Sequence, residues 1–292
     1  MKKKNVKGNI GNKSQWAMVW FRFRKNKLAM FGLIMICILL VLSVTSSLWI
    51  DYSRVYTQNM VDRFQSPNAE HWFGTDQYGR DLFARVMYGG KISLSAGLVV
   101  VAIALALGVV VGGAAGFFGG RVDTILMRLC DIFLAVPRLL LAMAIVSALG
   151  QGTEKMLIAL SISTFPGFAR IVRASILTLR NQEYVEAAKC CGTSSSRIIF
   201  KHIIPNGMGP VIVSATLALG GTILGIAALG FLGIGVVPPT PEWGTILSEN
   251  RTNIRYYPYL GLIPGMFIAI SVMCLNFVGD GLRDALDPRT KN

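Results

Sequence analysis

The chain has 292 residues, of which 53% are hydrophobic and only 15% are charged, and its formal net charge is +14. Soluble domains carry about 25% charged residues, so this composition excludes an ordinary soluble domain and indicates an integral membrane protein. A basic balance can also indicate nucleic-acid binding. The positions of the basic residues, described below, instead attribute the charge to membrane topology.

The N-terminal segment, residues 1–27, is rich in lysine and arginine and contains no acidic residue. From Ser14 onward, apolar and aromatic residues recur at helical spacing beside basic ones, which predicts a short helix lying in the lipid headgroups. The alternative is a solvated tail with anchoring aromatic residues. Both interpretations predict binding to anionic membrane lipid.

The first long apolar run, Leu28–Ile50, contains no charged residue. As a helix it would be about 35 Å long, which exceeds a hydrocarbon core of about 30 Å. It is too long for the apolar region of a cleaved signal peptide, so we expect it to be retained. Five further runs predict five more spans, and hence an all-α membrane protein with six transmembrane helices: Ile92–Phe118, Leu129–Leu149, Met156–Leu177, Gly209–Ile234 and Tyr259–Gly281.

The loop charges orient these spans. Most lysines and arginines outside the spans fall together if the first segment, the second and fourth loops and the tail are cytoplasmic, so both termini are predicted to be cytoplasmic. The resulting organisation is a cytoplasmic segment 1–27, a first helix 28–50, an extracytoplasmic segment 51–91, a five-helix core 92–281 and a cytoplasmic tail 282–292.

No motif indicates an enzyme or a metal site. The sequence around Gly89, Gly90 and Lys91 lacks the first glycine and the hydroxyl residue of a phosphate-binding loop. The five cysteines lack metal-site spacing, and the two histidines, His71 and His202, are predicted to lie on opposite membrane faces. We therefore expect a non-catalytic chain that binds no metal and no cofactor.

Within the predicted spans, small and ionisable residues stand out. Gly108, Gly112 and Gly116 recur every fourth residue, which predicts close helix packing, either within the chain or at a moving seam between subunits. Asp131 and Arg138 are two helical turns apart, so they are predicted to share a face beside a kink at Pro137. They form either a polar gate on a transport path or a structural pair.

Other polar residues in the spans have a structural interpretation. Asn276 and Asp280, near the end of the last span, are interpreted as structural. Arg170, Arg173 and Arg180 share approximately one face of the fourth span, and we expect them to extend toward the headgroups.

A polar loop at residues 183–206 separates two of the apolar runs. Glu183–Cys191 favours a helix that Gly192 can end, and serines at 194–196 can cap a second helix that Pro205 would stop. A helix lying across the cytoplasmic membrane face would fit a groove in a soluble partner. The residues expected to form this docking surface are Glu186, Ala187, Ala188, Gly192, His202 and Pro205.

The spacing of these residues resembles the EAA loop of permease subunits of ABC importers. The segment FGTDQYGRDLFARVMYGGKISL, residues 73–94, resembles the signature of the dipeptide, oligopeptide and nickel permeases, in the subunit type with a GTDxxGRD segment. We expect these residues to form a structured outer face with local ion pairs rather than a catalytic site, and simple helix capping is the alternative. The motif positions are Gly74, Thr75, Asp76, Gly79, Arg80 and Asp81.

The resemblance continues at residues 229–247 and 279–289 and covers nearly the whole chain from Trp20. It implies the type I ABC importer permease architecture, a location in a bacterial or archaeal plasma membrane, and a heterodimer with a related permease. It also implies two cytoplasmic ATPase subunits, which carry ATP and Mg²⁺, and an extracytoplasmic binding protein. His202 departs from the general loop pattern and leaves its local contact open.

A dipeptide or oligopeptide is the expected cargo, and nickel or a nickel chelate is the alternative. A bare metal path would need converging imidazole, thiolate or thioether groups. The two histidines are predicted to lie on opposite membrane faces and the cysteines are scattered, whereas the sequence does not determine how the methionines cluster in space. An ion-coupled secondary transporter is the alternative of another class, but it would need acidic groups at mid-depth of the spans.

Overall fold

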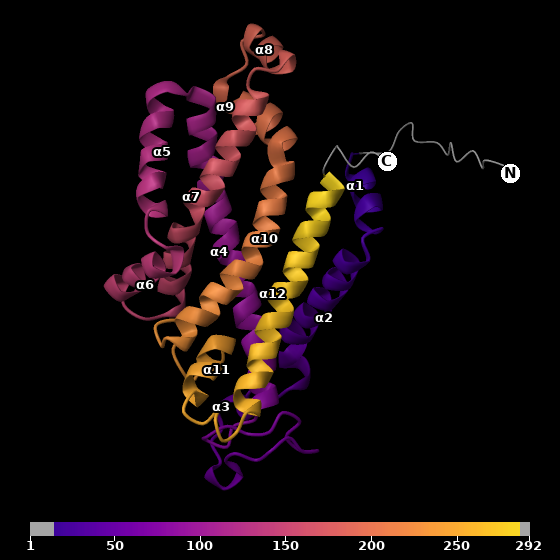
Figure 1. Ribbon diagram of the computed structural model, residues 1–292, viewed down its shortest axis with the longest axis vertical. Helices are drawn as coiled ribbons and strands as arrows, with labels where there is room; N and C mark the ends of the chain where they lie inside the picture. The colour runs from indigo at the N-terminus through magenta and orange to yellow at the C-terminus, as the bar shows by residue number, and fades with distance from the viewer. Residues whose placement is uncertain (1–14, 287–292) are drawn as a thin grey trace, which may run out of the picture.

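The computed structural model describes residues 15–286, a range made of helices and connecting segments with one isolated β-bridge between Thr75 and Asp81 (Figure 1). Five helices are long and apolar enough to cross a membrane. They are α2 (Lys27–Trp49), α4 (Leu82–Phe118), α7 (Thr153–Leu179), α10 (Ile204–Phe231) and α12 (Tyr259–Leu286). The short elements outside the polar loop are α1 (Gln15–Phe23), α3 (Ser53–Tyr56), the 3-10 turn η1 (Met60–Asp62) and α11 (Trp243–Asn250).

The predicted third span is broken into α5 (Gly120–Leu134) and α6 (Arg138–Leu149), which meet at 87°. The sequence predicts a kink at Pro137 within one helix, but the chain leaves the helix before this residue and restarts after it. Proline lacks an N–H and disfavours helical geometry in the residue before it, which explains the break. The two helices make a sixth crossing only if they are taken together as one span.

Helix α4 begins at Leu82, well before the predicted start of its span at Ile92, so the non-helical part of segment 51–91 is shorter than expected. The Asp81 carboxylate accepts a hydrogen bond from the Ala84 N–H at 3.0 Å and caps this start. Lys91 interrupts the apolar run without interrupting the backbone hydrogen bonds. With 37 residues, α4 is about 55 Å long and exceeds a hydrocarbon core of about 30 Å.

The glycine stripe of α4 packs against α7 of the same chain. A Cβ atom added at Gly112 would collide with the backbone of Ala169, and one added at Gly108 would lie 2.5 Å from the Cβ of Phe168. The two backbones therefore approach closely, as small residues allow in membrane helices. Of the two interpretations of this glycine stripe, the structure supports close packing within the chain.

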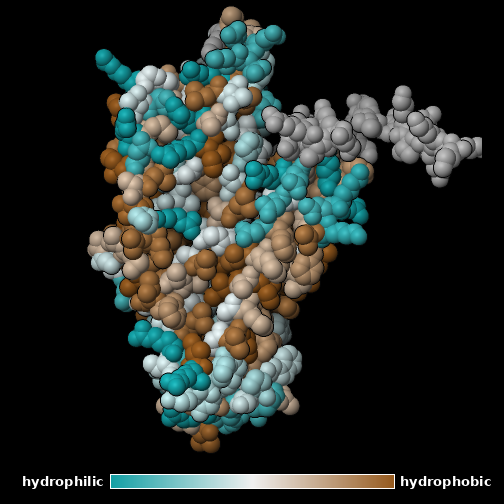
Figure 2. Space-filling view, viewed as in Figure 1, coloured by the Kyte–Doolittle hydropathy of each residue, from teal (hydrophilic) through white to brown (hydrophobic). Residues whose placement is uncertain are grey.

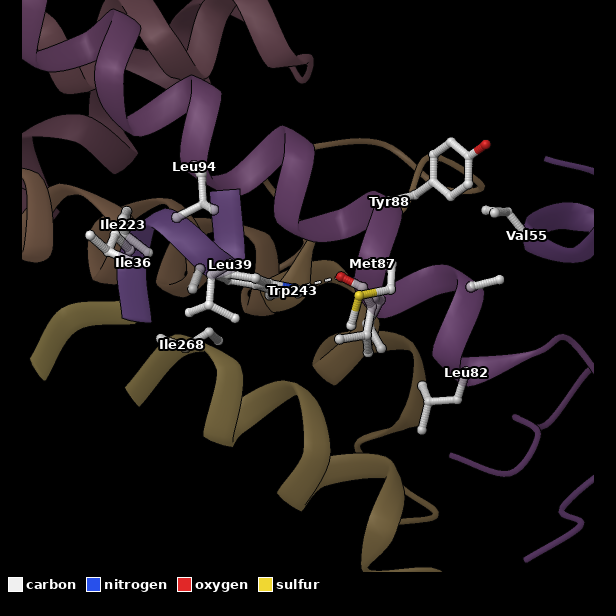
Figure 3. Packing of buried hydrophobic residues seen from close by; sticks show 14 of the residues in the cluster. Ile36, Leu39, Val55, Leu82, Met87, Tyr88, Leu94, Ile223, Trp243 and Ile268 are labelled. Carbon is white, nitrogen blue, oxygen red and sulfur yellow. Dashed lines mark hydrogen bonds between the residues drawn. The ribbon is translucent and has the colours of Figure 1, made fainter. Parts of the chain in front are cut away.

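The largest buried cluster lies where α2, α4, α11 and α12 meet (Figure 3). Trp243 is fully buried in it, and its indole N–H donates a hydrogen bond to the carbonyl of Val86 at 2.9 Å. Gly90 gives the ring space, since an added Cβ would lie 2.9 Å from the indole. This packing fixes α11 beside the first turns of α4.

Hydrophilic residues gather at both ends of the molecule, and apolar residues cover the middle of the face seen in Figure 2. One end carries the polar loop 183–206, which we call the loop end. The other carries α3, η1, the start of α4 and α11, which we call the motif end (Figure 1). The two predicted functional segments thus lie at opposite ends of the helical bundle.

Candidate functional site

The loop end is built from short helices that project beyond the bundle (Figure 1). The chain leaves α7, forms α8 (Glu183–Cys190), and then forms α9 (Ser195–Arg197) and the π-helical segment η2 (Ile198–Ile203) before entering α10. The predicted pair of helices separated by Gly192 is present.

Gly192 ends α8 through its backbone conformation. Its φ of 72° is left-handed, which glycine adopts without steric cost. The N–H of Thr193 donates to the carbonyl of Ala188 at 3.1 Å, which is the bond expected of a Schellman motif at a helix end. An added Cβ at Gly192 would meet no atom within 4 Å, so the backbone geometry alone accounts for glycine here.

The predicted stop at Pro205 is wrong. The second helix runs through η2 directly into α10, and Pro205 lies in the first turn of α10. Proline is tolerated in a first helical turn, and a π-type turn removes the need for the N–H that proline lacks. The loop is therefore joined to a spanning helix by continuous helical backbone.

The loop has one buried side and one exposed side. Val185, Ile198 and Ile203 are buried in a cluster with Ile176 of α7 and Val211 of α10. This anchor holds the short helices on the ends of the two spanning helices.

The opposite side of the loop carries predicted docking residues. Glu186, Ala187 and Gly192 are exposed, while Ala188 and His202 are partly buried. The carbonyl of His202 accepts a hydrogen bond from the side chain of Asn206 at 2.7 Å. The loop thus presents a small polar knob on a fixed apolar base.

At the motif end, Gly74 and Gly79 make tight turns with φ of 77° and 70°. An added Cβ would collide with the carbonyl oxygen of Gln65 at Gly74 and of Asn59 at Gly79. The Thr75 hydroxyl donates to the carbonyl of Asp62 and accepts from the N–H of Gln65. The GTDQYGRD segment is therefore a packed turn.

A buried ionic cluster follows this turn. Asp76 and Arg80 form the predicted local ion pair, with Arg80 Nε 2.6 Å from Asp76 Oδ2. Glu249 of α11 binds Arg80 at 3.0 Å and also binds Arg85. Arg85 Nη1 lies 3.6 Å from Asp76, so two arginines and two carboxylates balance in charge.

The cluster is nearly sealed from solvent, because the side chains of Asp76 and Arg85 are 0% exposed. Charges in such surroundings are tolerated only when they are paired and hydrogen-bonded. Arg85 Nε has no hydrogen-bond partner among the described residues, so the pairing does not satisfy every donor. The arrangement binds α11 to the start of α4.

Asp81 serves a separate set of contacts. Besides capping α4, it accepts from Arg54 at 2.8 Å and lies 3.1 Å from His71 Nδ1. Nearby, hydrogen bonds from the backbone and hydroxyl of Ser53 lower the pKa of the Asp51 carboxyl. These contacts hold α3 against α4.

Asp131 and Arg138 do not share a helix face, which corrects the prediction. The break at Pro137 separates them, and Asp131 pairs with Arg170 of α7 at 2.6 Å. Arg138 instead donates to the carbonyl of Gly221 in α10 at 2.6 Å. A role of either residue in gating stays a prediction.

Two other arginines of α7 also have partners in the chain. Arg173 binds Asp123 through two hydrogen bonds, and Arg180 donates to the carbonyl of Gly116 at 3.1 Å. These contacts hold α4, α5 and α7 together, and the extension of these arginines toward the headgroups stays a prediction.

Sequence reasoning missed Glu249, Glu242 and the role of Arg85. Glu249 lies in an ordinary helical stretch. Its partner Arg85 precedes it by 164 residues, so no local pattern joins the two. Glu242 is fully buried and accepts hydrogen bonds from the Ser93 hydroxyl and the Thr245 N–H at 2.9 Å each. An acidic residue directly after prolines and before an apolar helix was the only local signal.

Among residues 15–286, no group of three or more metal-ligating side chains is close enough to hold an ion.

Comparison with known proteins identifies the family. Residues 83–292 match the binding-protein-dependent transport system inner membrane component family. Residues 14–67 match the N-terminal transmembrane domain of oligopeptide transport permease C. Together the two matches span nearly all the described chain.

Curated relatives agree with this assignment over almost their whole lengths. The dipeptide transport system permease protein DppC of Alkalihalophilus pseudofirmus is 46% identical, covering 96% of this chain and 91% of the relative. The oligopeptide transport system permease protein OppC of Bacillus subtilis is 42% identical over 95% of this chain and 91% of its own. The glutathione transport system permease protein GsiD of Escherichia coli is 38% identical, covering 96% of this chain and 92% of the relative.

A solved structure of the MetNI methionine ABC transporter has the same fold, with a TM-score of 0.58 at 19% identity over 70% of this chain and 98% of that chain. The all-helical fold agrees with these matches. The chain belongs to the family of binding-protein-dependent inner membrane components, the permease subunits of ABC importers.

Proposed function

We propose that the chain is one transmembrane subunit of an ATP-driven importer of dipeptides or oligopeptides. The observation that carries this proposal is the exposed helical knob of loop 183–206, anchored on α7 and continuous with α10. Relatives named for dipeptide, oligopeptide and glutathione transport support a peptide cargo, since glutathione is itself a small peptide.

The proposed assembly contains a related permease subunit, two ATPase subunits and an extracytoplasmic binding protein. The loop end faces the cytoplasm, where Glu186, Ala187, Ala188, Gly192, His202 and Pro205 form the ATPase-docking region. Both termini lie on this cytoplasmic side, in a bacterial or archaeal plasma membrane. ATP and Mg²⁺ bind the ATPase subunits, and the permease supplies the path.

In this assembly, closure of the ATPases displaces α8 and α9. Because η2 joins these elements to α10 without an intervening loop, the displacement is transmitted into a spanning helix. The path then alternates between outward and inward access. The motif end, with Asp76 and Arg80 fixed by Glu249, forms the outer rim beside the binding protein or the related subunit.

Glu186→Lys tests the docking assignment. Glu186 is exposed, so the substitution should leave membrane abundance at the parent level while it reverses the charge of the knob. In reconstituted complexes, ATP hydrolysis stimulated by loaded binding protein and peptide uptake should both fall about tenfold or more. The control is Glu154→Lys, an exposed glutamate at the start of α7. Parent-level stimulation and uptake in Glu186→Lys would refute docking at this surface.

The cargo assignment has its own test. Calorimetry of the partner binding protein with short peptides and nickel chelates side by side should give tight binding to peptides. Tight chelate binding without peptide binding would favour the nickel alternative. Uptake by this chain alone, driven by a proton or sodium gradient, would favour an ion-coupled transporter.

A further inference from the structure

Some charged residues on the membrane-embedded helices have no ion-pair partner among the described residues. Asp131 and Asp123 pair with arginines of α7, whereas Arg138 of α6 and Asp280 of α12 form no ion pair with any residue in the range 15–286. Ionisable groups in membrane-spanning segments are costly unless they are compensated, and so they mark functional positions. These two remain to be explained.

Arg138 and the α12 residue Asn276 border one strip of α10. The Arg138 guanidinium donates to the carbonyl of Gly221, and its Nη2 lies 3.6 Å from where a Cβ of Gly221 would stand. The side-chain oxygen of Asn276 lies 3.4 Å from the corresponding point on Gly220. Successive residues of a helix point about 100° apart, so the guanidinium and the amide flank α10 from two sides at one level.

Between these flanks, α10 presents an accessible surface. Leu224 lies one turn beyond Gly220, is 55% exposed, and forms one wall of a groove of about 590 Å³. The other lining residues belong to α12 and include Met273, Asn276 and Asp280. Its volume falls within the range of about 300–1,000 Å³ typical of small-ligand sites.

Asp280 is four residues beyond Asn276 on α12, so the two lie about 6 Å apart along the same helix face. Their amide and carboxylate oxygens provide hydrogen-bond acceptors in the groove. Arg138, which lies outside the groove lining, provides a cation on the Gly221 side of α10. The strip is therefore apolar along its length and oppositely charged at its two borders. A short peptide at neutral pH has the complementary form, with an ammonium at one end and a carboxylate at the other.

We propose that this strip is the wall of the translocation path that holds the two charged ends of a short peptide, with Asp280 and Asn276 facing the ammonium and Arg138 facing the carboxylate. The proposal rests on the proposed function and adds the residues that contact the cargo. Asn276 and Asp280 are then cargo-binding residues, which replaces their structural interpretation from the sequence.

The test uses the complete complex in proteoliposomes, with peptide delivered by loaded binding protein. Asp280→Asn and Arg138→Gln should each lower peptide uptake per ATP hydrolysed about tenfold, because each removes one charge-assisted contact. Asp280→Glu should retain most uptake. The yield of assembled complex and the stimulated hydrolysis should stay within twofold of the parent.

Matched controls are available on the same helices or next to them. Asp284→Asn lies one turn beyond Asp280, where its carboxylate contacts Asn26 instead of the groove. Arg128→Gln removes an 80% exposed arginine of α5. Both controls should transport at the parent rate.

A second arm locates the cargo directly. A peptide with a photoreactive amino-terminal residue should crosslink to the groove, at Leu224 or Met273, in the parent complex. A loss of uptake that follows a loss of assembled complex would assign the charges to the related subunit and overturn the proposal. Parent-level uptake in both charge variants would also overturn it, while peptide uptake by the parent would still uphold the proposed function. If the parent complex takes up no peptide, both this proposal and the proposed function are overturned.

Discussion

The two ends of the molecule differ in the burial and pairing of their motif residues. At the motif end, Asp76, Arg80 and Arg85 are buried and find their partners within the chain. Asp76 pairs with both arginines, and both arginines pair with Glu249 of α11. At the loop end, Glu186 and Ala187 are exposed, and only the apolar base of the loop is buried. The motif end pairs its charges within the subunit, whereas the loop end leaves its polar face exposed, which fits the docking role proposed for it.

The glycines show the same contrast. Gly79 and Gly192 both have left-handed φ, but an added Cβ at Gly79 would collide with the backbone of Asn59, whereas one at Gly192 would meet open space. The first glycine is required by both conformation and packing. The second is required by conformation alone, as expected of a surface that another protein covers.

The largest expected effect is at the ionic cluster. Arg80→Ala or Glu249→Ala removes one member of a buried pair and leaves an opposite charge uncompensated, which should cost about 3–5 kcal/mol of stability. Thermal unfolding of the purified complex and membrane abundance should both fall, and uptake should fall with abundance. Glu70→Ala, at an exposed glutamate of the same end, is the control.

The double variant sharpens this prediction. If Arg80 and Glu249 act as a pair, their combined substitution should cost less than the sum of the single substitutions. Additive costs would show that the 3.0 Å contact between the two side chains contributes no coupling energy.

A smaller effect is expected from paired glycine substitutions. Gly79→Ala adds steric overlap to the strain of a left-handed alanine and should cost about 2–4 kcal/mol. Gly192→Ala carries the conformational strain alone, about 1 kcal/mol, so the subunit should stay abundant while coupling to ATP hydrolysis weakens. Equal losses of thermal stability in the two variants would contradict the comparison.

The smallest perturbation uses the native cysteines. Cys190 and Cys191 are exposed at the loop end, while Cys130 and Cys274 are buried. A water-soluble maleimide should label the first two rapidly in the permease without ATPase, and bound ATPase should slow this labelling several-fold. Labelling that is independent of the ATPase would place the docking surface elsewhere.

Sequence patterns predicted the features that depend on residues close to one another in the chain. Five of the six apolar runs predicted spanning helices that the structure contains, Gly192 predicted the end of α8, and the charges at Asp76 and Arg80 predicted their ion pair. Each depends on residues within a few turns of one another, where propensity and helical periodicity apply directly.

Features that depend on tertiary contact escaped prediction. Asp131 binds Arg170 on another helix rather than sharing a face with Arg138, because the break at Pro137 turns the chain by 87°. Pro205 did not stop its helix, because it lies in the first turn of α10 after a π-type turn, where no hydrogen bond from its backbone nitrogen is needed. Glu249 could not be assigned to the cluster because no sequence pattern marks a partner so far along the chain.

That separation has a consequence for how the protein is made. Arg85 precedes Glu249 by 164 residues, which at about 5–20 residues per second corresponds to roughly 8–33 s of synthesis. During this interval Asp76 is the one carboxylate of the cluster available to two arginines, and water must solvate the excess charge. The cluster closes only when α11 has been synthesised and placed beside α4, so a closed motif end reports that synthesis has passed Glu249.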